Sequence, residues 1–526
     1  MTPILAAFGV IDWTVLALYM VVMIVIGAAV AHRQNDATDF FLGGRTMPAW
    51  AVALSILATS LSAATFIGVP ELSYGGDLTY LSLNLGGTLA AFVVAFVFVP
   101  PIYRAGTLTI YGYLGNRLDE GSMILASAAF LIGRLLASGA RLFIAGIAFY
   151  TILFGTGEIQ LPRLIVAIVV LGGIGTLYTV LGGIRAVIWT DVIQIVVMTG
   201  AAILSIGLLL KAIPLPLTGI MAALKDTNGI DKLRLINTEA DFSKAFTIWA
   251  AWAVVFSETA AYGTDHDLAQ RMLTTRSPWR ASCSLIAAKL LSIPVILLFL
   301  IVGLLLSIFY GRPEIMGEAA GAEQLLDTRK VYPQFLVNHM PTGIAGLAMA
   351  GLFAAAMSSF DSAVNAMAGS FMADLYLPLK RRAGGDKGNS PPPLEMTLKT
   401  SRQVVALVGI VLIIFAIGSV FMQAAAGDNL INFALGVMTF AYAGILGVFL
   451  SAILLGRGNR HSVLGALVGG VVVVLLLQDY TLPHLTRWIS GEPFKLAWPY
   501  WMLIGTTVSF LICITGSPAA SRRHPR

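Results

Sequence analysis

Residues 354–366 read AAAMSSFDSAVNA and lie inside a long apolar stretch that runs from Gly343 to about Met372. Three serines, an aspartate and an asparagine fall within eight residues of it. Close packing of small residues explains the alanines and serines of such a segment. It does not explain Asp361, because an ionisable side chain inside a membrane span is costly and normally faces a cavity or a partner. The stretch therefore indicates a helix with a functional polar face.

The composition places this helix in an integral membrane protein. The chain has 526 residues, of which 57% are hydrophobic and 11% charged, with a mean hydropathy of +0.85. Soluble domains carry about 25% charged residues. The apolar runs last about twenty residues, the length of a spanning helix, whereas barrel strands alternate polarity over about ten. We therefore predict an all-α bundle in the lipid bilayer.

The net charge and the cysteines exclude other classes. A net charge of +6 is modest and indicates basic cytoplasmic loops rather than nucleic-acid binding. Cys283 and Cys513 both fall in apolar segments, so they provide neither a disulfide framework nor a metal site. The segment that begins at Ile11 has no small-residue cleavage site and is interpreted as a retained helix.

The apolar segments predict about thirteen spans, an odd number that puts the two termini on opposite sides of the membrane. The basic stretches 276–280, 379–388 and 521–526 would then share one side, which the excess of Lys and Arg marks as cytoplasmic. This gives an N-terminus outside, with a short Gly/Pro-rich linker at 383–393. The expected spans lie near 11–31, 48–70, 78–101, 121–154, 163–183, 186–210, 244–262, 281–309, 341–370, 402–424, 428–455, 461–478 and 497–516.

The second span reads LATSLSAATFIGVPELSYGG over residues 57–76. Its hydroxyl side chains, followed by Gly68 and Pro70, are typical of an interrupted helix, whose freed carbonyls can coordinate a cation. An intact helix whose hydroxyls bond their own backbone fits the same residues. The sequence alone leaves both structures open.

Several charged or amide residues stand in or beside other spans. Arg134 and Arg141 are seven residues apart and share one helix face. Each needs a compensating partner, because an arginine at mid-span costs at least about 2.5 kcal/mol. After Glu258, the residues 265–267, Asp-His-Asp, are expected to leave the membrane. The other candidates are Asn84, Asp191 and Lys289.

On a helix, five residues of the opening stretch project along one side, with Asp361 at the margin. Hydroxyls with one carboxylate suit Na⁺, which binds hard oxygen donors, whereas a transition metal would need Cys and His. The alternative is a polar seam for close helix packing. The five residues are Ala355, Ser358, Ser359, Ser362 and Asn365.

These residues resemble the sodium:solute symporter family, which includes sodium–sugar, proline, pantothenate, monocarboxylate and sialic acid transporters. The resemblance covers roughly residues 12–480. It rests on RQNDATDFFLGGRTMPAW leading into ATSLSAATFIGVP, then on GGIRAVIWTDVIQ, TDHDLAQRML and GLFAAAMSSFDSAVNA. Each motif is degenerate alone, but in this order the set is specific.

The resemblance implies the inverted-repeat fold of the leucine-transporter type, with two five-helix repeats around a site at the midplane. The whole chain, 1–526, would be one transmembrane domain. Residues 48–210 would form the first repeat and 244–455 the second. One extra helix at 11–31 would precede them, and two extra helices at 461–516 would follow.

The resemblance also implies two Na⁺ sites. The first would use backbone oxygens of Ala58, Leu61 and Ala355 with the hydroxyls of Ser358 and Ser359. A second, found in some members, would use Asp191, Ser358 and Ser362. Sialic acid transporters have serine where Asp361 stands here. Asp361 would therefore either add a carboxylate to the second Na⁺ site or carry a proton in place of an ion.

For the solute, the resemblance implies Ser62, Thr65, Asn84 and Arg134, the positions that match contacts in sialic acid relatives. Glu258 and Lys289 match contacts in sugar transporters, and Tyr80 and Tyr262 match aromatic gates. A guanidinium favours a carboxylate ligand, so Arg134 indicates a sugar acid or monocarboxylate. Glu258 opposes a simple anion unless Lys289 or Arg141 neutralises it. A neutral sugar or polyol is the alternative.

The predicted function is secondary active symport by alternating access, in which the Na⁺ gradient drives uptake of a small polar solute. A membrane enzyme is disfavoured because no HExxH, nucleophile elbow or phosphate loop occurs. A transporter-like sensor would need a signalling domain, which the short stretch after Ile514 does not provide. Neither the stoichiometry nor the oligomeric state follows from the residues.

Overall fold

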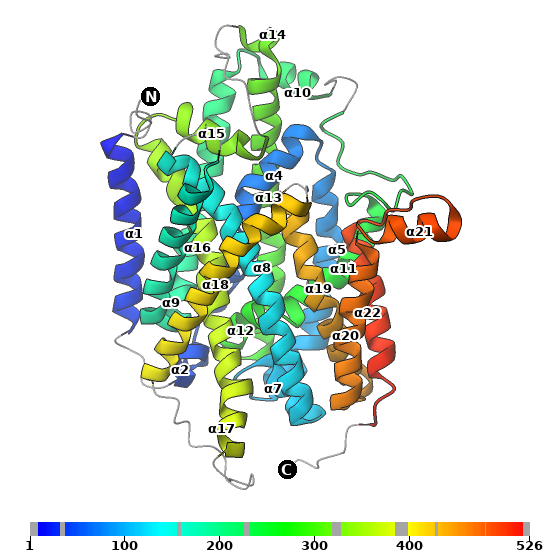
Figure 1. The fold of residues 1–526 in the computed structure, drawn as a ribbon. Coiled ribbons are helices and arrows are strands. Elements are labelled where there is room, and N and C mark those ends of the chain that lie inside the picture. The colour runs from blue at the N-terminus through cyan, green and yellow to red at the C-terminus, as the bar shows by residue number, and fades with distance from the viewer. Residues whose placement is uncertain are drawn as a thin grey trace.

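The computed structural model describes residues 9–31, 37–154, 159–225, 231–317, 328–383, 398–426, 430–478 and 480–518. Their regular structure is helical, apart from isolated backbone bridges such as Met47 with Thr275. The long helices stand side by side in one bundle (Figure 1). The Gly/Pro-rich linker, from residue 384 on, and the basic stretch 521–526 lie outside the described residues.

The α-helices are as follows: α1 Val10–Ala31, α2 Ala37–Leu42, α3 Ala49–Ser60, α4 Ala63–Gly75, α5 Leu83–Val93, α6 Val99–Arg104, α7 Ile110–Arg117, α8 Glu120–Phe154, α9 Leu161–Ala212, α10 Leu217–Lys225, α11 Ile248–Gly263, α12 His266–Leu273, α13 Pro278–Gly311, α14 Pro313–Met316, α15 Val331–Asn338, α16 Ile344–Ser370, α17 Leu377–Ala383, α18 Leu398–Ala426, α19 Leu430–Leu450, α20 Arg460–Leu477, α21 Leu482–Ser490 and α22 Trp498–Cys513. Short 3₁₀ or π segments are η2 Gly43–Arg45, η3 Thr79–Ser82, η4 Val94–Phe98, η6 Thr328–Lys330, η7 Phe371–Tyr376 and η8 Ser451–Leu455.

The helices match the expected spans. Within the described residues, eight helices are long and apolar enough to cross a membrane, and the bent pair α3 and α4 makes a ninth. The other four expected segments also contain helix, namely the first half of α9, α11, α19 and α22. These four are shorter in the described part of the chain, so length alone does not identify them.

The 52-residue helix α9 is two spans joined at a glycine. Gly183 has φ 55° and ψ −168° inside it. This backbone conformation is open to glycine and strained for other residues. The kink divides the helix near the boundary expected between segments 163–183 and 186–210.

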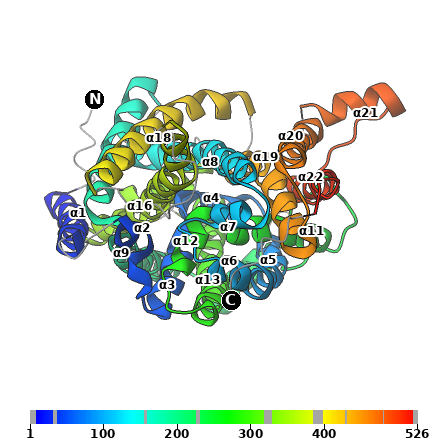
Figure 2. The same cartoon turned by 90° about the horizontal axis from the view of Figure 1, so that it is seen from below.

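Helix α16 runs through the middle of the bundle and packs against α9, α8, α1 and α12 (Figure 2). Small residues allow this close approach. A Cβ at Gly346 would lie 2.7 Å from the backbone of Asp12 on α1. The Asp12 carboxylate in turn accepts backbone N–H bonds from Gly343 at 2.7 Å and Gly346 at 2.8 Å. It thereby caps the start of α16, where a negative charge also complements the helix dipole.

Large apolar side chains are exposed on the outer helices, as expected for lipid-facing surfaces. Leu18 on α1, Ile414 on α18 and Val468 on α20 are examples. Helix α1 begins at the end of the bundle where α10 and α14 lie, and α22 ends at the opposite end, where α17 lies (Figure 1). This agrees with an odd number of crossings.

Candidate functional site

The second span is broken, as one of the two sequence interpretations predicts. Helix α3 ends at Ser60 and α4 begins at Ala63, with a bend of 57° between them. Leu61 has φ −96° and ψ 107°, and Ser62 has φ −104° and ψ 178°, both extended. The alternative of an intact helix is therefore wrong.

The break releases the two carbonyls that the resemblance assigns to Na⁺. In a continuous helix, Ser62 N–H would donate to Ala58 O, and Thr65 N–H to Leu61 O. Here Ser62 N–H donates to Thr65 Oγ1 at 3.3 Å, and Thr65 N–H donates to Ser62 O at 2.8 Å. Both donors are redirected by local capping of α4. Carbonyl oxygens of this kind are cation ligands in interrupted helices.

Helix α16 presents its hydroxyls to this break. Ser359 Oγ lies 3.5 Å from Thr59 O, and Ser362 Oγ lies 3.3 Å from Thr59 Oγ1. Ser358 and Ser359 are 1% and 3% exposed. Ala355, one turn earlier, is also buried. The residues expected at the first Na⁺ site thus come from the two facing elements α3 and α16.

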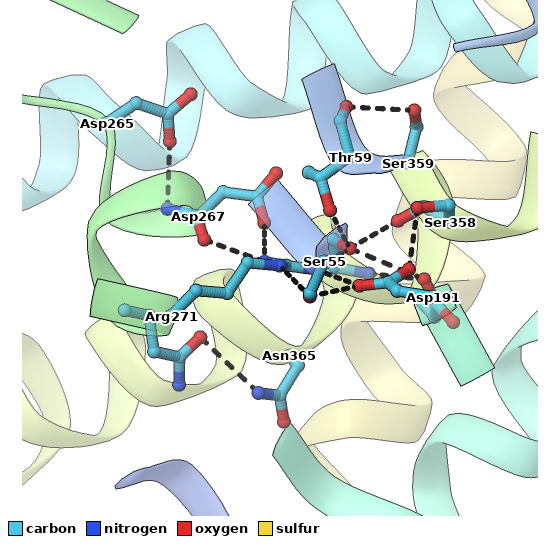
Figure 3. A network of polar contacts seen from close by, with 12 residues as sticks. Ser55, Thr59, Asp191, Asp265, Asp267, Arg271, Ser358, Ser359 and Asn365 are labelled. Atoms are coloured by element: carbon cyan, nitrogen blue, oxygen red, sulfur yellow. Dashed lines mark hydrogen bonds and ion pairs between the residues drawn. The ribbon is translucent and has the colours of Figure 1, made fainter. Parts of the chain in front are cut away.

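Asp191 of α9 gathers hydroxyls from both of these helices (Figure 3). Its Oδ1 accepts from Ser358 Oγ at 2.6 Å, and its Oδ2 accepts from Ser55 Oγ at 2.5 Å. The side chain is fully buried. The residues expected at the second Na⁺ site, with Ser362 one turn from Ser358, therefore lie together.

Arg271 of α12 is a site residue that the sequence analysis missed, although it quoted the motif TDHDLAQRML. Arg271 Nη2 lies 3.1 Å from Asp191 Oδ2 and also donates to Ser362. Its Nε donates to Ser55 Oγ at 2.8 Å. Arg271 thus partly compensates Asp191 and uses oxygens expected to bind the second cation.

Asp361 is fully buried on α16, next to this network. Its Oδ1 accepts the backbone N–H of Ser362 at 2.8 Å. It also acts electrostatically on Arg271. Because Asp361 is buried away from water, a negative charge on its carboxylate needs a positive group nearby.

A second break separates α11 from α12. Helix α11 ends at Gly263, Thr264 has φ −125° and ψ −7°, and Asp265 has φ −88° and ψ 117°. Asp265 caps α12, because its Oδ1 accepts the N–H of Asp267 at 3.0 Å. Residues 265–267, which the sequence predicts as the exit from the span, do not form a solvent-exposed loop, since Asp265, His266 and Asp267 are at most 1% exposed.

A cavity of about 140 Å³ lies between the two breaks. Arg141, Asp265 and Trp498 line it together with every residue expected to contact or gate the solute. The structure therefore brings together eight residues from five helices and the 3₁₀ segment η3. These eight are Ser62, Thr65, Tyr80, Asn84, Arg134, Glu258, Tyr262 and Lys289.

Arg134 of α8 is held by protein carboxylates. Its Nη1 donates to Asp265 Oδ2 at 2.7 Å, and its Nη2 pairs with Asp267. Tyr442 OH lies 3.4 Å from Nη1 and donates to Asp265. Arg134 Nε is buried with no hydrogen-bond partner among the described residues. The guanidinium therefore carries structural ion pairs in the wall of the cavity.

Glu258 is neutralised within the cavity. Lys289 Nζ of α13 donates to Glu258 Oε2 of α11 at 3.1 Å. Neutralisation of Glu258 by Lys289 is one of the two conditions under which the site would accept an anionic solute. The Lys289 side chain is buried, whereas that of Glu258 is 31% exposed.

Aromatic side chains form another part of the wall. Tyr80 packs edge-on against Phe246, with ring centroids 5.4 Å apart. Trp498, at the start of α22, lines the cavity, and its indole Nε1 is buried without a hydrogen-bond partner among the described residues. The sequence offered no signal for Trp498, because α22 lies outside the two expected repeats.

Comparison with known proteins gives one family. The model of the sodium:solute symporter family matches residues 40–472. A sodium/sialic acid symporter of Proteus mirabilis is 30% identical over 486 residues, which cover 89% of each chain. The human sodium-coupled monocarboxylate transporter 1 is 27% identical, over 90% of this chain and 73% of its own. A Na⁺-coupled sialic acid symporter, solved substrate-bound and outward-open, has the same fold with a TM-score of 0.80. It is 24% identical, over 98% of this chain and 99% of its own.

Proposed function

Because the chain belongs to the sodium:solute symporter family, we propose that it imports a sialic acid or a related sugar acid together with Na⁺. Membership makes it a multi-pass Na⁺-coupled transporter with the inverted-repeat fold of the leucine-transporter type. The identity of the solute and the roles of individual residues are the proposal.

The observation that carries the proposal is the charge of the cavity wall. Three cationic side chains line the cavity, Arg134, Arg141 and Lys289, against two carboxylates, Glu258 and Asp265. Among the lining residues the cations outnumber the carboxylates by one, and two of the three cations are guanidiniums, the best protein partners for a solute carboxylate. Asp267, which does not line the cavity, also pairs with Arg134, so a solute carboxylate would share that guanidinium with protein carboxylates.

Hydrogen-bonding groups around these charges suit the hydroxyl and amide groups of a sugar acid. Ser62, Thr65 and Asn84 supply hydroxyl and amide groups along the same wall. Tyr80 and Tyr262 supply apolar ring faces against which a sugar ring can pack. Sites for small solutes combine a few well-placed polar groups with apolar surface, as this wall does.

For the cation, we assign the first site to the carbonyls of Ala58, Leu61 and Ala355 with Ser358 and Ser359. The redirected N–H groups of Ser62 and Thr65 support this assignment, because the carbonyls of Ala58 and Leu61 no longer accept the bonds that they would accept in a continuous helix. Neutral oxygen donors suit a monovalent hard cation.

We assign the second cation site to Asp191, Ser358, Ser362 and Asp361. The charges around it support a cation: Asp191 and Asp361 are buried carboxylates beside it. Arg271 pairs with Asp191 and also with Asp267, which balances Arg134. Asp191 and Asp361 against Arg271 leave one negative charge when all three are ionised, which one monovalent cation would balance.

Transport then follows from the two broken spans. A cation bound between α3 and α16 would hold the first break in one arrangement and so favour the state that accepts the solute. Tyr80 and Tyr262 would close over the solute, and rocking of the helices that carry the breaks would open the site to the other side. The cavity holds and orients the solute without altering it, so we propose no catalytic step.

We propose the cell membrane (in bacteria, the inner membrane) as the location, with the N-terminus outside and the C-terminus in the cytoplasm. Lys380 and Arg381 on α17 lie at the end of the bundle where α22 also ends. Basic residues next to membrane spans favour the cytoplasmic side.

The test is a thermal-shift screen of the purified protein with and without Na⁺, with choline as the replacement cation. N-acetylneuraminate and other carboxylates are compared with neutral sugars and polyols. The proposal expects the largest stabilisation from N-acetylneuraminate in Na⁺, because a ligand that binds the folded state raises its stability. A larger shift with a neutral sugar would overturn the carboxylate assignment and favour hydrogen bonding to Asn84, Glu258 and Lys289.

A further inference from the structure

We propose that Asp267 is the positioning residue that couples the cation site to the solute cavity, an inference that rests on the proposed function. The sequence analysis placed this residue outside the membrane. The structure buries it completely, between two arginines that serve different sites.

The observation is a continuous chain of buried ion pairs, of which Figure 3 shows the part from Asp191 through Arg271 to Asp267. Asp191 Oδ2 lies 3.1 Å from Arg271 Nη2, and Arg271 Nη1 lies 2.9 Å from Asp267 Oδ1. Asp267 Oδ2 pairs with Arg134 Nη2, and Arg134 Nη1 lies 2.7 Å from Asp265 Oδ2. The chain begins at a proposed cation ligand and ends in the wall of the cavity. Every side chain in it is at most 2% exposed.

Asp267 is the link of this chain. Among the described residues, it is the carboxylate that pairs with both arginines, and it gives each arginine a different oxygen. Its backbone is fixed as well: its N–H donates to Asp265 Oδ1 at 3.0 Å, and its carbonyl accepts from Arg271 Nη1 at 2.8 Å. Charge pairs in such a dry interior interact far more strongly than in water.

The chain gives the coupling a sign. A cation beside Asp191 repels Arg271, and the ion pair between Arg271 and Asp267 becomes stronger. Asp267 in turn holds Arg134 less firmly, so the guanidinium is freer to bind a solute carboxylate. The reverse also holds: a carboxylate on Arg134 frees Asp267 for Arg271, which leaves Asp191 and Ser362 to the cation. Each ligand therefore raises the affinity for the other, as linkage requires.

Suppose that Asp267 only held α12 in place against α8. Its substitution would then lower the stability of the protein but would not change how much Na⁺ raises the affinity for the solute. The discriminating quantity is therefore a ratio: the Kd for N-acetylneuraminate in choline divided by its Kd in Na⁺. Couplings between two sites are typically about 5- to 150-fold.

The experiment measures this ratio for the wild type, Asp267→Asn and Asp374→Asn in detergent. Asp374 is the matched control, because it is also a buried carboxylate but is held by hydroxyls, those of Thr109, Ser370 and Ser127. We expect a ratio well above 1 for the wild type and Asp374→Asn, and a ratio near 1 for Asp267→Asn. An unchanged ratio in Asp267→Asn overturns the inference and leaves the proposed function standing. A wild-type ratio of 1 overturns both.

A second arm needs no variant and so does not depend on the folding of Asp267→Asn. The wild-type ratio is measured with the methyl ester of N-acetylneuraminate, which lacks the charge that would compete for Arg134. We expect the ester to bind more weakly and with a clearly smaller ratio than the acid. Equal ratios for acid and ester mean that the coupling does not pass through Arg134, which overturns the inference.

Discussion

The two broken spans each leave two residues between their helices, Leu61 and Ser62 in one and Thr264 and Asp265 in the other, but their chemistry is opposite. Between α3 and α4, the redirected donors leave the neutral carbonyls of Ala58 and Leu61 without the bonds of a continuous helix, and Ser359 of α16 approaches the neighbouring Thr59 O at 3.5 Å. Between α11 and α12, the carboxylate of Asp265 caps the new helix, and the carboxylates of Asp265 and Asp267 both bind arginines. Each break frees the backbone from helix bonding, but the side chains decide what the break can bind.

This difference teaches how one fold can bind a cation and an anion a short distance apart. In the proposed function, neutral oxygens hold a monovalent ion that must leave again in each cycle. Paired carboxylates instead hold arginines in fixed positions, and one face of that arginine cluster lines the solute cavity. The chain of ion pairs through Arg271 connects the two breaks.

The largest effect should come from the hydroxyls at the first break. Replacing both Ser358 and Ser359 with alanine removes two cation ligands and should lower Na⁺-driven uptake at least about 100-fold, because each such contact contributes about 1.5–3 kcal/mol. Uptake into proteoliposomes measures this. Ser307→Ala is the control, since the hydroxyl of Ser307 donates to Leu304 O of its own helix and has no other partner among the described residues. Uptake by the double variant at the control level would rule out these ligands.

A smaller effect is expected at the second break from Arg134→Lys. Lysine keeps the charge but loses the planar fork, so Asp265 and Asp267 lose paired contacts. N-acetylneuraminate should bind about 10- to 100-fold more weakly, with a loss of stability below the 3–5 kcal/mol of a fully broken buried pair. Binding and unfolding of the purified variant measure the two quantities. If binding stays at the wild-type level while stability falls, Arg134 is structural only.

The capping residue Thr65 gives a more moderate test of the first break. Thr65→Val removes the acceptor for Ser62 N–H without changing the volume much. We expect Na⁺ to bind about 5- to 30-fold more weakly, the equivalent of about 1–2 kcal/mol. Thr151→Val is the matched control, because its hydroxyl bonds only Ile147 O of its own helix among the described residues. Equal Na⁺ affinities in the two variants would show that the contact between Ser62 N–H and Thr65 does not contribute to Na⁺ binding.

The smallest effect concerns Trp498. Trp498→Phe keeps most of the ring and removes the indole N–H, so the solute affinity should fall by less than about 10-fold, as for the loss of one hydrogen bond. Trp488→Phe is the control on the exposed face of α21. If neither substitution changes the affinity, Trp498 contributes shape and no hydrogen bond.

Much of this architecture was predictable from the residues. Local patterns carry the positions of the spans and the polar face of α16, because each depends on composition within one segment. The same patterns allowed the first break only as one of two possible structures. The eight cavity residues were also predicted together, through the resemblance to a family.

What the sequence could not predict is long-range pairing. Asp265 and Asp267 look like a polar loop when the chain is considered segment by segment. Their burial depends on Arg134, which lies 131 residues from Asp265. Arg271 likewise reaches Asp191 across 80 residues. No local sequence pattern encodes such partners. The buried charges are tolerated because the fold brings the carboxylates and the arginines into contact.

The central claim is that the first break binds the cation whose gradient drives uptake of an organic acid through the cavity. The most direct measurement is uptake of labelled N-acetylneuraminate into proteoliposomes with an inward Na⁺ gradient, compared with an equal choline gradient. The account predicts accumulation above equilibrium with Na⁺, and loss of that accumulation when an ionophore collapses the gradient. Equal uptake in Na⁺ and in choline would contradict it.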